Sequence, residues 1–221
     1  SDEHLWKQFK TSKNLDGEAK YPIGKESPIF GSSIEAFNEK RTLKSEELTA
    51  QMINAKHLLS IFLQGNEKIS DTFNINKLAK SLALIDLTNS DHSFLWHNQR
   101  FYYDPIQAKL IPIGFDADAN RVPLYSLSIA DKHPWIKNLF SDLDFVKKYT
   151  SALEDIAEKD YLDSFLSEIK IQFDKNRKIL YRSFPALNTN TNQIYKNQDV
   201  IKKYLNPPLP LNSFFQKISQ K

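Results

Sequence analysis

Residues that could take part in metal or acid–base chemistry gather in one short stretch of the chain. Carboxylates and one amide recur there at the expected ends of helices and strands, at Asp86, Asp91, Asn98, Asp116 and Asp118. Hard divalent cations such as Mg²⁺ prefer oxygen ligands of this kind and leave positions open for phosphate oxygens. The pattern is equally typical of a structural role, in which Asp91 and Asn98 are helix-end and turn residues and Asp116 caps the next segment.

Several other kinds of chemistry are excluded by what the sequence lacks. The chain contains no cysteine, so thiolate nucleophiles, disulfides and iron–sulfur clusters are absent. Its five glycines are scattered and form neither a P-loop nor a dinucleotide fingerprint. Residues 116–120 begin like a calcium loop, but Arg121 and Leu127 occupy the positions of the required glycine and glutamate.

The overall composition is that of a globular protein. The chain has 221 residues, 40% of them hydrophobic, and a formal net charge of +3. This length suits one large domain or two small ones. The small charge gives no reason to expect a nucleic-acid partner. No apolar run approaches the roughly 18 residues that span a membrane, so we expect no transmembrane segment, and the polar start does not resemble a signal peptide.

Helices and one hairpin are expected to position the acidic stretch. A helix with Ser45 as its N-cap and an apolar face from Leu48 to Phe62 should pack against a second helix over residues 74–87. Aromatic residues over 97–104 and an apolar run over 109–115 predict a hairpin, whose second strand Pro112 places at an edge.

The rest of the chain is predicted to be mainly helical after residue 134. A loop is expected over 188–193, followed by a last short helix over about residues 198–205. Residues 1–42 show no sustained periodicity and are expected to be irregular. We therefore predict an α+β fold, mostly helical with a small hairpin between helices, that occupies residues 43–221.

This order of elements resembles the C-lobe of a protein-kinase-like fold, in which a helix, a catalytic loop, a hairpin and a metal-binding aspartate follow one another. More narrowly, the sequence resembles the CotH-type kinases, the bacterial spore-coat and surface kinases. The matching segments are residues 73–80 (FNINKLAK), 97–105 (HNQRFYYDP) and 110–118 (LIPIGFDAD). Phe115 stands where that family usually has a tryptophan before its metal-binding aspartate.

The resemblance implies Mg²⁺ and ATP as cofactors and a Ser or Thr hydroxyl of a protein as the phosphate acceptor. It implies that Asn98 and Asp116 bind the metal and the nucleotide, so that their side chains should converge at the mouth of the hairpin. Asp118 would ligate a second metal or support the first one.

The resemblance also assigns the proton-accepting role to Asp91, which should border the same site. Asp86 or His92 would be the substitute base if Asp91 does not approach the hydroxyl. Because residues 1–42 contain no alternating strands with a phosphate-pairing lysine, we expect the chain to be the C-lobe of a longer protein that supplies an N-lobe.

Two functions remain open at this level. One is an atypical kinase, whose location at the bacterial cell surface or outside the cell is implied only by the resemblance. The other is a non-catalytic pseudokinase domain that keeps the fold as a surface or scaffold module.

Overall fold

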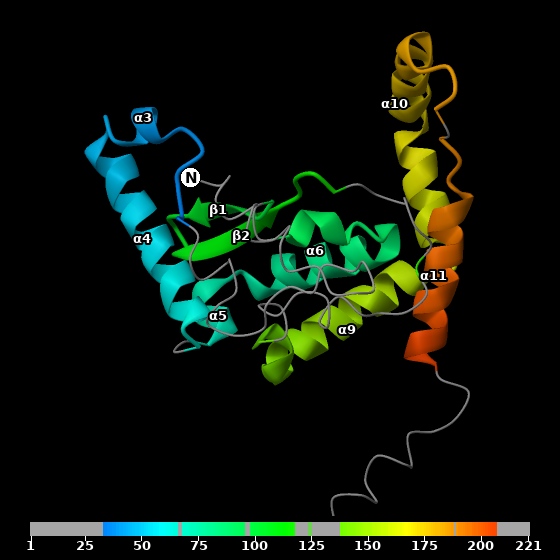
Figure 1. Cartoon of the computed structure of the whole chain (residues 1–221). Helices are drawn as coiled ribbons and strands as arrows, with labels where there is room; N and C mark the ends of the chain where they lie inside the picture. Colours follow the sequence, from blue (N-terminus) through cyan, green and yellow to red (C-terminus); the bar gives the residue numbers. More distant parts are fainter. Residues whose placement is uncertain are drawn as a thin grey trace, which may run out of the picture.

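The structure is a computed structural model that describes residues 33–65, 68–95, 98–117, 124, 138–187 and 189–206. Helices make up most of this part of the chain, and one two-stranded antiparallel sheet lies among them (Figure 1). The predicted α+β, mostly helical fold class is confirmed.

Nine helices and two strands follow one another along the described residues. They are α3 (Glu39–Thr42), α4 (Glu46–Leu63), α5 (Ile69–Thr72), α6 (Ile75–Thr88), the 3₁₀ helix η1 (Asp91–Phe94), β1 (Arg100–Asp104), β2 (Lys109–Ile113), the 3₁₀ helix η2 (Asn138–Ser141), α9 (Leu143–Ala157), α10 (Tyr161–Ser183) and α11 (Asn192–Leu205). The hairpin and the two predicted helices before it, α4 and α6, lie close to their predicted positions.

Helix α6 lies at the centre of the core. The Asn74 side chain caps its first turn by accepting a hydrogen bond from the Lys77 amide. Its buried residues form two adjacent rows at four-residue spacing, Leu78, Leu82 and Asp86 in one and Ala79, Ala83 and Leu87 in the other. The two alanines in one row leave room for a neighbouring backbone to come close.

The main partner of α6 is α9. Helix α9 buries Phe145, Tyr149, Leu153 and Ile156 at helical spacing. The two helices also share a buried polar contact, in which the Tyr149 hydroxyl donates a short hydrogen bond to the Asp86 carboxylate. This bond satisfies a charged group inside an otherwise apolar interface.

Helix α4 packs against α5 and the hairpin. Phe62 meets the ring of Phe73 edge-on at 4.9 Å, and Phe73 meets Phe101 of β1 at 5.6 Å. Helices α4 and α6 contribute to the same hydrophobic core, with Phe62 from α4 and Leu78 and Leu82 from α6. The main contacts of α6 are nevertheless with α9, and aromatic side chains connect α4 to β1. An apolar helix face predicts burial but does not specify the partner.

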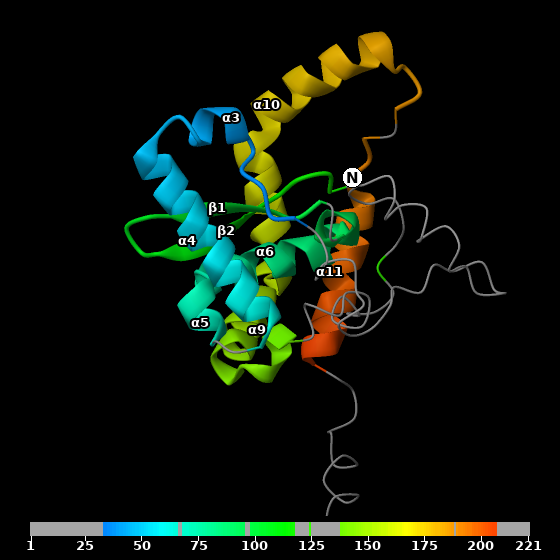
Figure 2. The same ribbon diagram turned by 60° about the vertical axis from the view of Figure 1, so that its left-hand side comes forward.

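Helices α10 and α11 differ in how they join the core. Helix α10 is one long helix within the region that is predicted to be mainly helical, but Leu162 is its only buried residue. Its far end projects beyond the other described elements (Figures 1 and 2). Helix α11 begins at Asn192, so the predicted loop over 188–193 ends earlier and the last helix starts about two turns before residue 198.

The N-terminal prediction is partly outside the described residues. Residues 33–38 have no helix or strand, as expected, but Glu39–Thr42 form the short helix α3, which corrects the irregular assignment of residues 1–42. The Asn38 side chain caps this turn by accepting a hydrogen bond from the Arg41 amide. In the part of the chain that the structure describes, no helix is long and apolar enough to cross a membrane.

Replacement of Tyr149 by Phe should change the pH dependence of stability. Burial, and then the Asp86 charge and hydrogen bond, raise the pKa of Tyr149 above its ordinary value. The folded protein therefore keeps a proton that the unfolded chain releases near pH 10, and the free energy of unfolding should fall as pH rises above about 10. In Tyr149→Phe this alkaline decline should be shallower by up to about 1.4 kcal/mol per pH unit.

The same variant should be less stable than the parent at pH 7, by about 1–3 kcal/mol, because Asp86 loses its buried donor. Urea unfolding at pH 7, 10 and 11 measures both effects. Tyr102→Phe is the control, since Tyr102 is an exposed tyrosine of β1. Equal alkaline slopes in the two variants would contradict the assignment.

Candidate functional site

The turn after α6 fixes the first part of the candidate site. Asn89 adopts a left-handed conformation (φ 43°), which small amide side chains tolerate, and it ends the helix. The Ser90 amide then donates to the Ile85 carbonyl at 3.0 Å, and the Ser93 hydroxyl donates to the Ser90 carbonyl at 2.9 Å. These bonds hold η1 in place at the end of the core helix, so His92 is presented from an ordered turn.

The hairpin brings the second part of the site to the same place. Its register pairs Arg100 with Ile113. Asn98 precedes β1 by two residues and Asp116 follows β2 by three, so both lie at the open end of the hairpin. A predicted contact between residues 18 positions apart in the chain thus follows from the pairing of two short strands.

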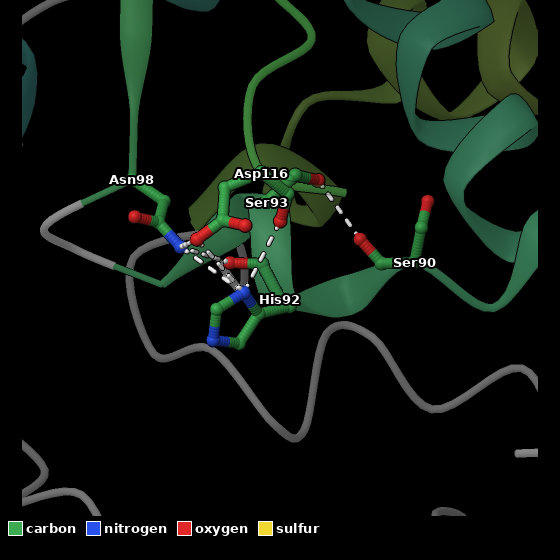
Figure 3. Close-up of polar contacts among 5 residues, drawn as sticks. All are labelled: Ser90, His92, Ser93, Asn98 and Asp116. Carbon is green, nitrogen blue, oxygen red and sulfur yellow. Dashed lines mark hydrogen bonds and ion pairs between the residues drawn. The ribbon is translucent and has the colours of Figure 1, made fainter. Parts of the chain in front are cut away.

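Asn98, Asp116 and His92 form one hydrogen-bonded cluster, shown in Figure 3. The Nδ2 of Asn98 lies 3.0 Å from the Asp116 carboxylate and 3.1 Å from the main-chain carbonyl of His92. The Nδ1 of His92 lies 3.1 Å from the Asp116 carbonyl oxygen and 3.3 Å from its carboxylate. Asn98 is 4% exposed and therefore lies on the buried side of the cluster, whereas the Asp116 side chain is 52% exposed.

The hydrogen-bond partners assign the orientation of the Asn98 amide. The carbonyl of His92 and the carboxylate of Asp116 are acceptors only, so both must face the Asn98 NH₂ group, which has two hydrogens to give. The Nδ1 of His92 lies 3.1 Å from the Asp116 carbonyl oxygen and 3.2 Å from the Asn98 Nδ2, so it donates or accepts according to the tautomer of the ring. In this orientation the amide oxygen of Asn98 points away from Asp116 (Figure 3).

Asp116 itself has an unusual backbone conformation. Its φ of 49° lies in the left-handed region, which residues other than glycine rarely adopt. The preceding residue, Phe115, lies under the guanidinium of Arg100 at 4.6 Å from its ring centroid. A cation–π contact on one side and the cluster on the other thus hold the carboxylate at the end of β2.

The predicted site residues have different outcomes. The predicted approach of Asn98 and Asp116 is confirmed by their hydrogen bond. Asp91 begins η1 beside His92, and its predicted part in proton transfer stays a prediction. Asp86 is buried and accepts the hydrogen bond from Tyr149, which makes it a member of the α6–α9 interface. Asp118 lies outside the described residues.

The sequence-based argument underestimated His92 and missed Asn197. His92 was considered only as a substitute base, whereas both its ring and its carbonyl contact the other members of the cluster. Asn197 lies just before the predicted start of the last helix, near residue 198, whereas in the structure it belongs to α11 and its side chain is completely buried. No hydrophobic pattern marks Asn197 as buried, because it is a polar residue in a stretch rich in Asn and Gln.

The donor atoms of the cluster fit Mg²⁺ in kind. Mg²⁺ is commonly held in proteins by one or two carboxylates, with water and substrate phosphates as its other ligands. Asp116 offers such a carboxylate, and Asn98 offers a neutral oxygen once its amide turns over. The described residues contain no group of three or more His, Asp or Glu side chains that could hold a metal ion by themselves.

Comparisons of the chain with protein-family models, with curated proteins and with solved structures find no match.

The left-handed conformation of Asp116 should be visible in stability measurements. Asp116→Ala and Asp116→Gly both remove the carboxylate, but only alanine puts a Cβ at φ 49° without a polar side chain to compensate. We expect the Gly variant to be more stable than the Ala variant by about 1 kcal/mol. Chemical unfolding of both variants tests this difference, and equal stabilities would mean that the conformation relaxes when the carboxylate is removed.

Proposed function

We propose that this chain takes part in Mg-ATP-dependent phosphoryl transfer to Ser or Thr of a protein substrate, as the helical lobe of a CotH-like atypical kinase. The observation that carries the proposal is the contact between Asn98 and Asp116 at the open end of the hairpin. These are the two positions at which the resemblance to kinase-like sequences expects the metal ligands. Bound Mg²⁺ would neutralise phosphate charge, which is the main requirement of this reaction.

The residues of the cluster divide the work in this proposal. Asp116 supplies the carboxylate that faces the cation, and Asn98 supplies a second oxygen. His92 holds the Asp116 main chain through its ring, and the Asn98 side chain through its carbonyl. Asp91, at the start of the same 3₁₀ helix, is the proposed acceptor of the hydroxyl proton.

Other parts of a phosphoryl-transfer site have to come from elsewhere. The five glycines of the chain form no phosphate-binding loop, and the sequence predicts no strand with a phosphate-pairing lysine in residues 1–42. We therefore propose that a second, β-rich lobe of a longer protein covers the nucleotide, as the resemblance implies. Binding of Mg-ATP by the chain alone should be weak, because the parts that hold the phosphates would be supplied by that second lobe. The rate of transfer should be low for the same reason, since positioning of the phosphates supplies most of the rate enhancement.

A non-catalytic scaffold is the second candidate, and one observation favours it. The amide nitrogen of Asn98, not its oxygen, faces the Asp116 carboxylate. The polar groups of the cluster therefore form hydrogen bonds with one another, as expected of a cluster whose role is to hold the two strands of the hairpin together at their open end. Metal binding is the property that separates the two candidates.

Mn²⁺ can replace Mg²⁺ as a paramagnetic probe of this site, because both prefer carboxylate and carbonyl oxygens. In NMR spectra, we expect Mn²⁺ to broaden the side-chain amide signal of Asn98 and the main-chain signals around Asp116 first. Asp116→Asn keeps a side chain that tolerates the left-handed conformation and removes the charge. It should weaken Mn²⁺ binding at least about tenfold.

Asp104→Asn is the matched control for charge. Asp104 ends β1 at the opposite end of the same hairpin, and its carboxylate accepts the amides of Ile106 and Gln107. Asparagine keeps those turn contacts while it removes the same charge. Equal loss of Mn²⁺ binding in both variants, or no selective broadening in the parent, would favour the scaffold.

Phosphoryl transfer itself should depend on the context of the chain. With radiolabelled ATP, the 221-residue chain should label a Ser/Thr substrate little or not at all. In a longer protein that supplies the second lobe, Asp116→Ala should lower turnover at least about a hundredfold, since loss of a preorganised charge ligand costs about 3 kcal/mol or more. An active long protein that is indifferent to this change would show that the acidic turn is structural.

A further inference from the structure

Asn197 of α11 is a completely buried polar residue with an unusual set of partners. Its Nδ2 donates to the main-chain carbonyl of Leu87 at 2.8 Å. Its Oδ1 accepts the main-chain amide of Leu124 at 3.1 Å and the side-chain amide of Gln193 at 2.9 Å. One side chain thus joins two main-chain segments that lie far apart in the sequence.

Those two segments flank the candidate site. Leu87 lies in the last turn of α6, directly before the turn that leads to His92. Leu124 follows the hairpin and the acidic turn at Asp116. Leu87 and Leu124 are both buried beside Asn197, and in the sequence they lie on either side of the residues that form the candidate site.

We propose that Asn197 is a positioning residue, which holds both ends of the site-bearing segment so that Asp116 meets Asn98 and His92. The proposal rests on the proposed function for its biological meaning, because it is the geometry of the Mg²⁺ ligands that Asn197 would set. Asn197 acts through the main chain and does not itself touch the cluster.

The chemistry of the amide explains why asparagine suits this position. The Leu87 carbonyl needs a donor and the Leu124 amide needs an acceptor, and an amide side chain provides both from one short stem. The bond from Gln193 fixes which end of the amide faces which segment. An aspartate would set a charged oxygen against the Leu87 carbonyl, and an apolar residue would leave both main-chain groups buried without partners.

The neighbouring residue provides a matched control. Gln198 is also buried in α11, and its Nε2 donates to the carbonyls of Ile156 and Glu158 at the end of α9. It therefore joins the same helix to the core by the same kind of bond. Its partners, however, belong to α9 and not to the segments that flank the candidate site.

NMR spectra of the 221-residue chain can compare Asn197→Ala with Gln198→Ala. Both variants should lose stability. Only Asn197→Ala should shift the side-chain amide signal of Asn98 and the ring signals of His92, because only this change removes the hydrogen bonds to Leu87 and Leu124 on either side of the residues that form the site. In the Mn²⁺ titration, the dissociation constant of Mn²⁺ from Asn197→Ala should rise about tenfold, as is typical when a supporting residue of a metal site is lost. The dissociation constant of Mn²⁺ from Gln198→Ala should stay unchanged.

Equal shifts of the site signals in the two variants, or none in Asn197→Ala, would overturn the proposal. Should Asn197→Ala fail to fold, Gln193→Ala removes only the bond that orients the amide. It should then shift the same signals in the same direction by a smaller amount, and unchanged signals would count against the proposal. If Asn197→Ala shifts the site signals although the parent binds no Mn²⁺, Asn197 is supported as the positioning residue while the proposed function fails.

Discussion

The packing of α6 against α9 is the contact on which the other described elements depend. Leu78 and Leu82 of α6 are completely buried, and full burial of such a side chain contributes about 1.5–3 kcal/mol. The hairpin, α11 and the turn into η1 all contact α6 or continue from it. The position of its C-terminal end therefore sets where His92 can lie.

Apolar packing alone would let that end slide or rotate, and two buried polar contacts oppose this movement. The hydroxyl of Tyr149 binds Asp86 from the side of α9, and the amide of Asn197 binds the Leu87 carbonyl from the side of α11. Each contact is costly to break because a buried polar group would lose a hydrogen bond. Both lie in the last turn of α6, next to the segment that carries the cluster, so they combine stability with a defined orientation.

The sequence predicted those parts of the fold that depend on local periodicity. The helices over Glu46–Leu63 and Ile75–Thr88, the hairpin and the approach of Asn98 to Asp116 all agree with the structure. Contacts between elements were harder to predict: the apolar pattern did not identify α9 as the main partner of α6, and apolar residues of α10 such as Phe165 are about half exposed. Asn197 could not be found by hydrophobic pattern, because it is a buried polar residue in a stretch rich in Asn and Gln.

The orientation of Asn98 bears on how a cation would enter the cluster. For Asn98 and Asp116 to ligate one ion, the amide must turn and give up its bonds to the His92 carbonyl and the Asp116 carboxylate. Each such bond contributes about 1 kcal/mol, and more where a charge is involved. The exposed carboxylate of Asp116 needs no such change. In the proposed function Asp116 would therefore hold the cation from its present position, whereas Asn98 would contribute an oxygen only with its amide turned. The exposure of Asp116 and the hydrogen-bonded state of Asn98 therefore give the two side chains unequal access to any cation.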